Sequence, residues 1–363
     1  MNNKALVYGY KKINLGDDLF FSILFQKYPN TKFIFQGQKA YKKIFKHNKN
    51  VKVISPYSPF DLFLSFVDKV SQTKTESTLE KLAKYKVLIT GSGFREGSNK
   101  SECHKHINNL FIISSNFGPY YTEKFLKQNK QFFKNCIDVC FRDSQSYNLF
   151  SDLPNTHFAP DVVFDINTYY PSLSTNTPFF KSNNLCGQKY AVISLLSFEK
   201  RSKNSSLQKE YISGIKTIIN HLISKNHKIV LMAFCEAEGD CNSFNELLED
   251  DFIKANSYAY TYDGNIPEAL AIIENSETVI ATRFHSMVLG LAMNKKTLPI
   301  IYDSKMSNVL NDLGVKQFLD VKSIQDITPQ YFEEWYNNYH FIDCKKLASD
   351  AKQQFATLDN FLN

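Results

Sequence analysis

The chain has 363 residues, more than one ordinary hydrophobic core accommodates, so the sequence predicts two domains. Hydrophobic residues make up 43% of it and charged residues 22%, which is the balance of a soluble globular protein. No apolar run is long enough to span a bilayer, and the apolar part of residues 1–12 is too short for a secretory signal. We therefore expect a cytoplasmic protein.

Positive charge is concentrated at the start of the sequence. Residues 1–60 contain eleven lysines and two acidic residues, Asp17 and Asp18, so this region carries +9. The net charge of the whole chain is +7, which leaves −2 for the remaining 303 residues. Such an asymmetry indicates an anionic partner surface, such as a membrane, a nucleic acid or a polyanionic substrate.

An amphipathic segment follows this basic region. Residues 59–70 place four apolar side chains on one helical face: Phe60, Phe63, Leu64 and Val67. A basic region beside an aromatic amphipathic helix suits binding at a membrane surface. Packing of the helix on a sheet, with solvated lysines around it, explains the same pattern.

The cysteines do not indicate disulfides or a metal site. There are seven of them, an odd number scattered along the chain, so we expect reduced thiols. Cys103, His104 and His106 form the cluster that most resembles metal ligands, but no second ligand pair with suitable spacing accompanies it. We expect no metal and no other cofactor.

Apolar runs alternate with helical patterns through the first half of the chain. Strands, two of which run into glycine-bearing turns, are predicted at 4–10, 31–37, 51–56, 85–93, 109–119 and 138–141. Helices are predicted at 19–28, at 41–48 and from Asp143 or Ser144, both of which are good amino-terminal caps. This alternation is typical of a parallel sheet covered on both faces.

A second alternating run follows a segment without strong periodicity. Residues 171–188 are rich in Asn, Ser, Thr and Pro and form the predicted linker. Beyond it, strands are predicted at 190–196, 228–234, 278–283 and 298–303, and helices at 211–223 and 267–276. We therefore expect an amino-terminal domain at 1–170, a carboxy-terminal domain at 189–325 and a helical tail at 326–363.

These elements predict an α/β protein with two Rossmann-like domains that face one another across a cleft, followed by the helical tail. This is the GT-B type of architecture. In such sheets, ligands bind beyond the carboxyl ends of the strands.

The stretch from Thr278 to Gly314 carries the most informative side chains. Arg283, His285 and Ser286 fall at one strand-to-helix turn, and Lys305 falls at the next. Two fixed cations, an imidazole and two helix amino termini at one sheet edge make a strong anion site. A helix cap with a surface arginine is the alternative reading.

Several loops at corresponding positions are further candidates. After the first strand come Asn14, Gly16 and the two aspartates 17 and 18, of which we expect one to cap a helix and the other to act as a base or orient a hydroxyl. Gly93 and Arg95 belong to a possible anion-binding nest at 91–95. Arg142 follows the strand at 138–141 and reaches a ligand or pairs with Asp143 or Asp161. Glu236, Glu238 and Asp240 are read as a solvated loop.

Six segments in chain order resemble the bacterial polysaccharide pyruvyl transferase family. They are NLGDD (14–18), GSGFR (91–95), SNFGP (115–119), FRDSQS (141–146), APDVVF (159–164) and TRFHSMVLGLAMNKKTLPIIYDSK (282–305). The last of these, an RxH turn followed by an apolar helix, a proline-bearing strand and YxxK, is the specific one.

The resemblance implies transfer of the enolpyruvyl carbons of phosphoenolpyruvate to a sugar, with formation of a cyclic pyruvate ketal and release of phosphate. It implies that Arg283, Lys305 and Arg142 bind the doubly negative donor and that Asp17 activates or orients the acceptor hydroxyl. His285 is then the general acid or the cation that holds the phosphate. Further substrate contacts are expected from Ser286, Asn14, Gly16, Gly93 and Arg95.

The implied acceptor is a repeat unit of a capsule, exopolysaccharide or cell-wall polymer, built on polyprenyl diphosphate at the cytoplasmic face of the membrane. The basic region and the helix at 59–70 fit peripheral association there. The main alternative is a GT-B glycosyltransferase with a nucleotide-sugar donor. A non-catalytic polyanion-binding protein is a third reading, but it leaves Arg283, His285 and Lys305 without a purpose, and we do not expect nucleic acid as a partner.

Overall fold

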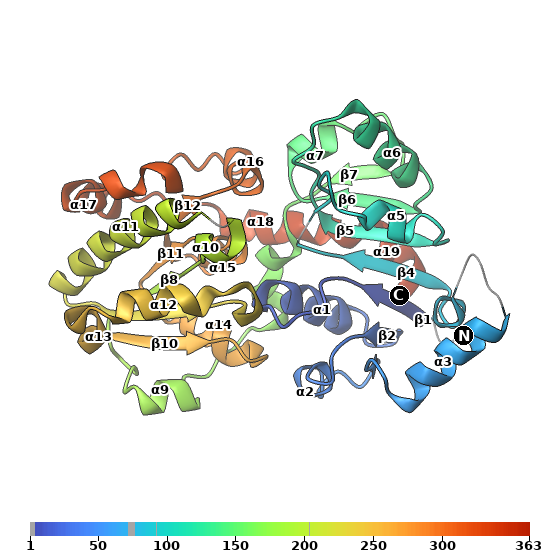
Figure 1. The fold of residues 1–363 in the computed structure, drawn as a ribbon, viewed down its shortest axis with the longest axis horizontal. Coiled ribbons are helices and arrows are strands. Elements are labelled where there is room, and N and C mark those ends of the chain that lie inside the picture. Colours follow the sequence, from blue (N-terminus) through green and yellow to red (C-terminus); the bar gives the residue numbers. More distant parts are fainter. Residues whose placement is uncertain (1–3, 72–76, 92, 203) are drawn as a thin grey trace. The chain divides into compact units, whose positions relative to one another are not determined.

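The structure is a computed structural model that describes residues 4–71, 77–91, 93–202 and 204–363. It divides into two compact units. The first comprises the described residues of 1–12, 17–162 and 349–363, and the second comprises 13–16 and the described residues of 163–348. Each unit is built around one parallel sheet with helices connecting its strands (Figure 1).

The sheet of the first unit has seven strands in the order β3-β2-β1-β4-β5-β6-β7. Their bounds are β1 Lys4–Tyr8, β2 Lys32–Gln36, β3 Val51–Ile54, β4 Tyr85–Ile89, β5 Leu110–Ser115, β6 Asp138–Phe141 and β7 Thr156–Phe158. The helices of this unit are α1 Leu15–Lys27, α2 Tyr41–Ile44, α3 Pro59–Ser71, α4 Thr78–Lys81, α5 Lys100–His104, α6 Glu123–Lys134, α7 Ser144–Asn148, η4 Lys352–Phe355 and α19 Ala356–Leu362.

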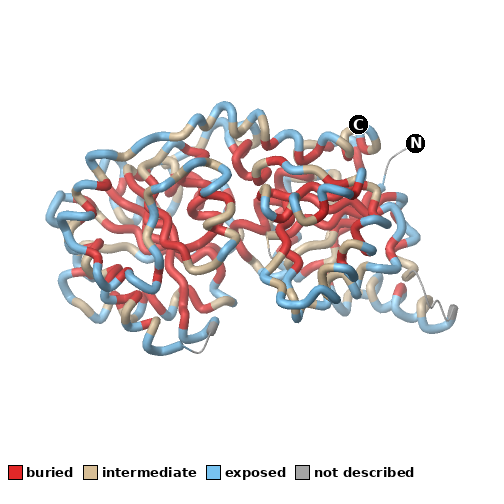
Figure 2. Tube along the Cα trace, turned by 90° about the horizontal axis from the view of Figure 1, so that it is seen from above, coloured by how far each residue is buried: buried red, intermediate tan, exposed pale blue. Residues whose placement is uncertain are grey.

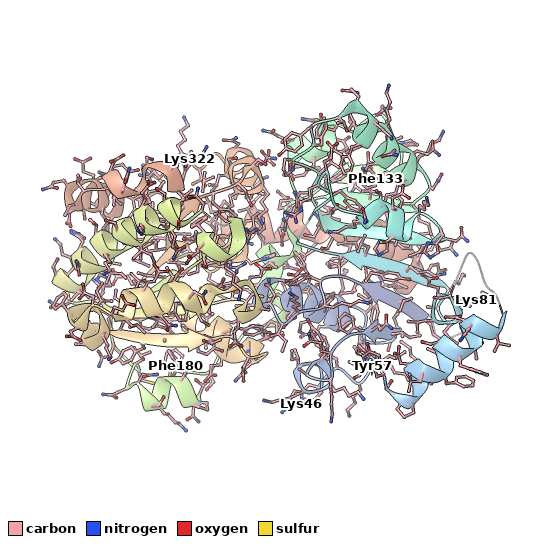
Figure 3. The ribbon with its side chains drawn as sticks, viewed as in Figure 1. Lys46, Tyr57, Lys81, Phe133, Phe180 and Lys322 are labelled. Carbon is pink, nitrogen blue, oxygen red and sulfur yellow. The ribbon has the colours of Figure 1, made fainter. Side chains whose placement is uncertain are left out.

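Local signals in the sequence account for these elements. The central strands β4 and β5 are buried along their whole length, as strands covered on both faces of a parallel sheet should be. Asp143 caps α7, because its carboxylate accepts a hydrogen bond from the Ser146 amide at 2.8 Å. The core between β4–β6 and the helices α6 and α7 is aromatic, and Phe133 points into it (Figure 3). Lys322, on the surface of the second unit, is an exposed side chain for comparison in the same view.

The last residues of the chain complete the first unit. The buried Gln354 side chain accepts from the Ser114 amide and donates to the carbonyls of Phe141 and Ala159. Phe361 of α19 packs its ring 5.5 Å from that of Tyr85 and 5.2 Å from that of Phe111, measured between centroids. The end of the chain therefore covers part of β4 and β5.

The sheet of the second unit has six strands in the order β10-β9-β8-β11-β12-β13. Their bounds are β8 Tyr190–Ser194, β9 Lys228–Ala233, β10 Ser257–Thr261, β11 Thr278–Ala281, β12 Lys296–Ile301 and β13 Leu319–Asp320. The connecting helices are η1 Val162–Asp165, α8 Ile166–Tyr169, α9 Pro178–Ser182, α10 Phe198–Ser202, α11 Ser205–Ser224, η2 Glu236–Glu238, α12 Asp240–Leu248, α13 Asp251–Asn256, α14 Ile266–Glu274, α15 Phe284–Ala292, α16 Ser304–Asp312, η3 Val321–Asp326, α17 Pro329–Asn337 and α18 Cys344–Ala351.

Helices lie on both faces of this second sheet. The helix predicted at 211–223 is confirmed as part of α11, and its apolar stripe faces the core: Tyr211, Ile215, Ile218, Ile219 and Leu222 are buried and Ile223 is half-buried. These side chains share a core with Ile280 of β11 and Leu298 of β12. The neighbouring residues Val279 and Thr297 point to the opposite face, where they touch α15 at Gly290. Buried segments therefore run through the middle of each unit, with exposed turns around them (Figure 2).

Both sheets have the strand order of a Rossmann fold, which confirms the predicted α/β class with two Rossmann-like domains. In each sheet the chain winds outward from one central strand, first to one side and then to the other. The order therefore reverses between β1 and β4 in the first unit and between β8 and β11 in the second. Across the described residues, no helix combines the length and apolar character that crossing a bilayer requires.

Candidate functional site

The point where the strand order reverses is the usual ligand-binding crevice of such a sheet, and both units place polar side chains there. In the second unit, Ser194 ends β8 and its hydroxyl accepts hydrogen bonds from the amides of Thr282 and Arg283, at 3.1 and 3.2 Å. The Thr282 hydroxyl in turn lies 2.9 Å from that of Tyr211. The turn between β11 and α15 is therefore fixed by side chains from β8 and α11.

Arg283 occupies the N-cap position of α15, and its guanidinium is held by two acidic side chains. Nε donates to Asp240 Oδ2 at 3.1 Å, Nη2 pairs with Asp240 Oδ1, and Nη1 pairs with Glu238. Burial opposes the charge of the guanidinium, but Asp240 and Glu238 outweigh it and raise the pKa of Arg283. Its charge is thus compensated within the protein.

The reading of residues 236–240 as a solvated loop is wrong for Asp240. This residue is fully buried, and besides Arg283 it accepts hydrogen bonds from the amides of Phe234 and Cys235, both at 3.0 Å. It therefore connects the end of β9 to the turn before α15. An acidic residue in a loop looks solvated in sequence unless its basic partner, 43 positions away, is known.

His285 lies in the first turn of α15 and is 8% exposed. Gly16, which belongs to the second unit, lies against it so closely that a Cβ at position 16 would overlap the imidazole. The Gly16 amide donates to Asn14 Oδ1 at 3.0 Å, and the Leu15 amide donates to the Phe234 carbonyl at 3.1 Å. The structure therefore brings the predicted residues Asn14, Gly16 and His285 together.

Lys305 lies in the first turn of α16, near the residues that connect β11 to α15. Its ammonium is 3.3 Å from Asp303 Oδ2, 5.6 Å from the centre of the Tyr302 ring and 5.9 Å from that of Phe284. Ser286, by contrast, is fully buried, and its hydroxyl has no hydrogen-bond partner among the residues that the structure describes. The imidazole centre of His285 and the ammonium of Lys305 thus lie 5.1 and 5.9 Å from the centre of the Phe284 ring, whereas the guanidinium of Arg283 is turned to its carboxylates.

Arg201 is a cation of this site that the sequence analysis missed. It lies on α10, directly beyond the central strand β8, with its guanidinium carbon 5.0 Å from the centre of the Tyr302 ring. Its Nη1 is 3.4 Å from Glu238 Oε2, so Glu238 joins Arg201 to Arg283. The sequence does contain a signal for Arg201. Lys200 and Arg201 follow the predicted strand at 190–196, and ligands bind beyond the carboxyl ends of such strands.

In the first unit, Asp17 lies where the strand order reverses. Its Oδ1 accepts a hydrogen bond from the Gly91 amide at 3.3 Å, and its side chain is nearly buried. Asp18 beside it is completely buried. Asp17, in the first turn of α1, therefore joins that helix to the loop after β4.

Arg142 is fully buried at the same edge, where its guanidinium contacts several neighbours. Nη1 is 3.0 Å from Asp161, and Nη2 donates to the Gly91 carbonyl at 2.9 Å and to Asn116 Oδ1 at 3.0 Å. Of the two possibilities left open by the sequence, the pairing with Asp161 is the one observed. Asn116 also closes over Gly93, where a Cβ would overlap its amide. Arg95 is exposed. Ser92, between Gly91 and Gly93, lies outside the described part of the chain.

Lys100 is a second residue that the sequence analysis missed. Its ammonium donates to the Thr90 hydroxyl at 3.3 Å and lies 5.5 Å from the centre of the Phe94 ring. Burial lowers the pKa of this ammonium to about 8; the charge of Asp17 opposes the shift, and those of Arg142 and Arg95 add to it. The sequence signal for Lys100 is its position: it follows a glycine-bearing loop at the end of a central strand.

Within the described residues, no group of three or more His, Cys, Asp or Glu side chains is placed to hold a metal ion. In the cluster at 103–106, His104 Nδ1 lies 2.7 Å from the Lys100 carbonyl and His106 Nε2 lies 3.3 Å from Glu80. Both rings are therefore engaged in local contacts.

Several solved structures share the fold of this chain. The UDP-GlcNAc 2-epimerase of Neisseria meningitidis, bound to UDP-GlcNAc, aligns with a TM-score of 0.62 and 11% identity over 99% of this chain and all of its own. HepE of Anabaena, in complex with UDP and glucose, aligns with a TM-score of 0.52 and 12% identity over all of this chain and 96% of its own. These similarities show the fold alone, which is of the GT-B type.

The chain belongs to the polysaccharide pyruvyl transferase family, whose model matches residues 14–304, and this confirms the resemblance seen in the sequence. The amylovoran biosynthesis protein AmsJ of Erwinia amylovora is 21% identical over 230 residues, which cover 60% of this chain. The same match covers 55% of AmsJ, so the chain spans about half the length of that relative.

Proposed function

We propose that this protein transfers the enolpyruvyl group of phosphoenolpyruvate to two hydroxyls of a sugar in a polysaccharide repeat unit, forming a pyruvate ketal and releasing phosphate. The observation that carries this proposal is the arrangement around α15, in which His285 and Lys305 both lie close to the Phe284 ring at the ends of neighbouring strands. We assign the donor to the second unit and the acceptor to the first.

The residues of the second unit suit a small anion. The first turns of α15 and α16 present backbone amides, and Lys305 adds a positive charge beside them. Because the guanidinium of Arg283 is held by Asp240 and Glu238, we propose that Arg283 supports the donor site by fixing the turn that carries His285. Arg201 supplies a further cation near Tyr302.

The chemistry then follows in two steps. His285 gives a proton to the methylene carbon of the donor, which makes the adjacent carbon electrophilic, and a sugar hydroxyl adds to that carbon. Phosphate leaves, and a second hydroxyl attacks the same carbon to close the ring. The two hydroxyl protons pass to the departing phosphate and to a base, and we propose Asp17 as the group that orients or deprotonates an acceptor hydroxyl.

We also propose that the acceptor is linked to polyprenyl diphosphate and that the protein meets it at the inner face of the cell membrane. The basic region at 1–60 supports this part of the proposal, because an anionic lipid surface attracts such a region. We propose further that Arg142 supports the acceptor side by joining Gly91, Asn116 and Asp161. Gly93 and Arg95, in the loop beside Asp17, are proposed to contact substrate.

The direct test is to incubate the protein with phosphoenolpyruvate and lipid-linked glycans. We expect phosphate release together with a glycan whose mass has increased by one pyruvate ketal. His285→Ala should lower turnover by at least about a hundredfold, because a general acid contributes that much. His340→Ala, at an exposed histidine of the same unit, is the matched control and should keep full turnover.

Asp17→Asn separates binding from chemistry. We expect this variant to lose turnover and still bind phosphoenolpyruvate. Release of a nucleotide from a nucleotide sugar, without consumption of phosphoenolpyruvate, would instead identify a glycosyltransferase. Full activity of His285→Ala would show that the assignment of the acid is wrong.

A further inference from the structure

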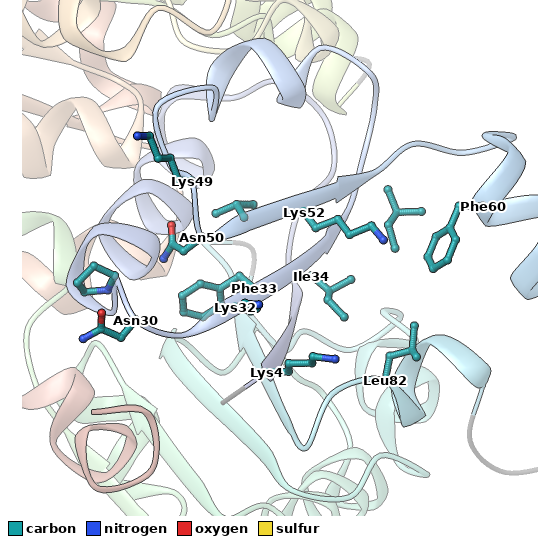
Figure 4. Close-up of a pocket in the computed structure, with 13 residues that line it drawn as sticks. Lys4, Asn30, Lys32, Phe33, Ile34, Lys49, Asn50, Lys52, Phe60 and Leu82 are labelled. Atoms are coloured by element: carbon teal, nitrogen blue, oxygen red, sulfur yellow. The ribbon is translucent and has the colours of Figure 1, made fainter. Parts of the chain in front are cut away.

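A pocket of about 590 Å³ lies in the first unit at the amino ends of β1, β2 and β3 (Figure 4). Its lining residues combine lysines with apolar side chains, and the ones that matter here are Lys4, Lys32, Lys49, Lys52, Ile34 and Phe60. The candidate chemistry of this unit lies at the other end of the strands, one strand length away, or roughly 16 Å. The pocket is therefore separate from the site described above.

The pocket exists because the helices leave part of the sheet face uncovered. Leu6, Ile34 and Ile54 of the three strands pack with Leu64 of α3 and Ala83, and this cluster closes one part of the face. Two positions earlier on each strand, the same face carries lysines instead of apolar residues: Lys4, Lys32 and Lys52. The open part of the face is thus basic.

These lysines lie side by side without acidic partners. Lys4 and Lys32 are opposite one another in the register of β1 and β2, and Lys52 is opposite Ile34 on the next strand. No acidic side chain lines the pocket, and within the described residues none of the four ammonium groups forms an ion pair. Like charges on neighbouring strands repel one another. An anion in the pocket would relieve this repulsion.

The pocket also borders an exposed apolar surface. Phe60 of α3 forms one wall, with the Lys52 ammonium 4.0 Å from the centre of its ring. On the apolar face that the sequence predicts for this helix, Leu64 is buried, but Phe63 is 58% exposed. Other exposed apolar side chains lie on α3 or just before it: Tyr57 (Figure 3), Leu62, Phe66 and Val70. Apolar surface of this kind on a helix beside lysines is typical of proteins that bind at membrane surfaces.

We propose that the lysine pocket binds the phosphate headgroup of an anionic phospholipid while α3 inserts its exposed apolar side chains into the bilayer surface. Lys4, Lys32 and Lys52 contact the phosphodiester oxygens, and Ile34 and Phe60 contact the glycerol and the first methylenes. The proposal commits to a lipid in a membrane because the basic pocket and the exposed helix share the wall formed by Phe60. It does not depend on the proposed transferase reaction.

Co-sedimentation with vesicles of phosphatidylcholine, with and without phosphatidylglycerol, tests the proposal. The wild-type protein should bind the anionic vesicles in preference to the neutral ones. Lys32→Gln/Lys52→Gln should lower the partition coefficient roughly 30-fold at low salt, which corresponds to about 1 kcal/mol for each lysine. The matched control is Lys42→Gln/Lys43→Gln on α2, which removes the same charge from the same basic region outside the pocket. It should lower the partition coefficient much less than the pocket pair does, because these two lysines do not line the pocket.

Two further variants complete the test. Lys4→Gln/Lys49→Gln removes the other two pocket lysines. It replaces the first pair if that pair proves unstable in thermal denaturation, and it should show the same loss of binding to anionic vesicles. Phe63→Ser/Phe66→Ser should weaken the binding that remains at high salt, where charge is screened. Equal losses for the pocket pair and the α2 pair would overturn the proposal, because charge alone would then explain binding. Binding without preference for anionic vesicles would also overturn it. So would loss of vesicle binding in the presence of soluble glycerol phosphate, because the pocket would then bind a soluble anion.

Discussion

Gly16 lies directly against the imidazole of His285, in a space that no larger residue can share. The two residues are 269 positions apart, and both belong to the second unit although Gly16 follows the first strand of the chain. The requirement for glycine in the NLGDD motif is therefore steric, whereas glycine in a loop is more often required for a left-handed backbone conformation. Gly16 is needed for the approach of its backbone to a side chain and not for a left-handed turn.

Replacing this glycine should displace the histidine. We expect Gly16→Ala to lower phosphoenolpyruvate-dependent phosphate release by about a hundredfold, because a shift of about 1 Å in a catalytic group has an effect of that size. In the His285→Ala background the same substitution should cause no further loss, since the residue that it displaces is gone. Additive losses in the double variant would show that Gly16 acts elsewhere.

The Arg283–Asp240 pair should dominate the stability of the second unit. Asp240→Asn leaves a buried guanidinium with only Glu238 as an acidic partner, and we expect the free energy of unfolding to fall by about 3–5 kcal/mol in denaturant titrations. Glu238→Gln should cost less, because Glu238 is partly exposed. Replacing both members, in Asp240→Leu/Arg283→Met, should restore part of the loss.

Lys100 should make the stability of the first unit depend on pH in the alkaline range. Its pKa is about 8 when folded and 10.5 in the unfolded chain. Below pH 8 both states hold the proton and the full cost of burying the charge applies; between pH 8 and 10.5 only the unfolded state holds it, so stability rises with pH. Lys100→Met should therefore stabilise the protein at pH 7 by at most about 3 kcal/mol and flatten this rise.

The control for Lys100 is a lysine on the surface of the same unit. Lys124→Met on α6 should leave the pH profile of unfolding unchanged, because its side chain is exposed. An unchanged profile for Lys100→Met as well would show that the ammonium is solvated in the folded state.

Arg201 should contribute to donor binding. Because it supplies a cation near Tyr302, Arg201→Ala should raise the KM for phosphoenolpyruvate by about tenfold, the value of one charge-assisted hydrogen bond, with little change in kcat. Lys209→Ala, which removes an equal charge from the exposed side of α11, should leave the KM unchanged. A KM equal to that of wild type for Arg201→Ala would remove this residue from the site.

The sequence predicts the fold well because its signals are local. Alternating apolar runs define the two parallel sheets, the stripe on α11 is buried as expected, and Asp143 caps α7. The family is recognisable for a similar reason, since its specific motif is one continuous segment from Thr282 to Lys305.

The site is harder to predict because its contacts join distant segments. Asp240 has the sequence context of a solvated acid, and only the fold places it against Arg283. Lys100 and Arg201 are basic residues among polar and charged neighbours, the commonest pattern on a protein surface. For Phe63, helical periodicity places the side chain on a face, but what covers that face depends on α4 and the sheet, and the structure leaves Phe63 exposed.

The chain crosses between its two units more than once. Residues 13–16 leave the first unit to join the second, and residues 349–363 return to close over β4 and β5. No single proteolytic cut can therefore yield two self-sufficient halves: a fragment ending near residue 162 would lack Gln354 and Phe361, and one starting there would lack Gly16. An engineer who wants the first unit alone must graft its missing final segment back on, for example by circular permutation.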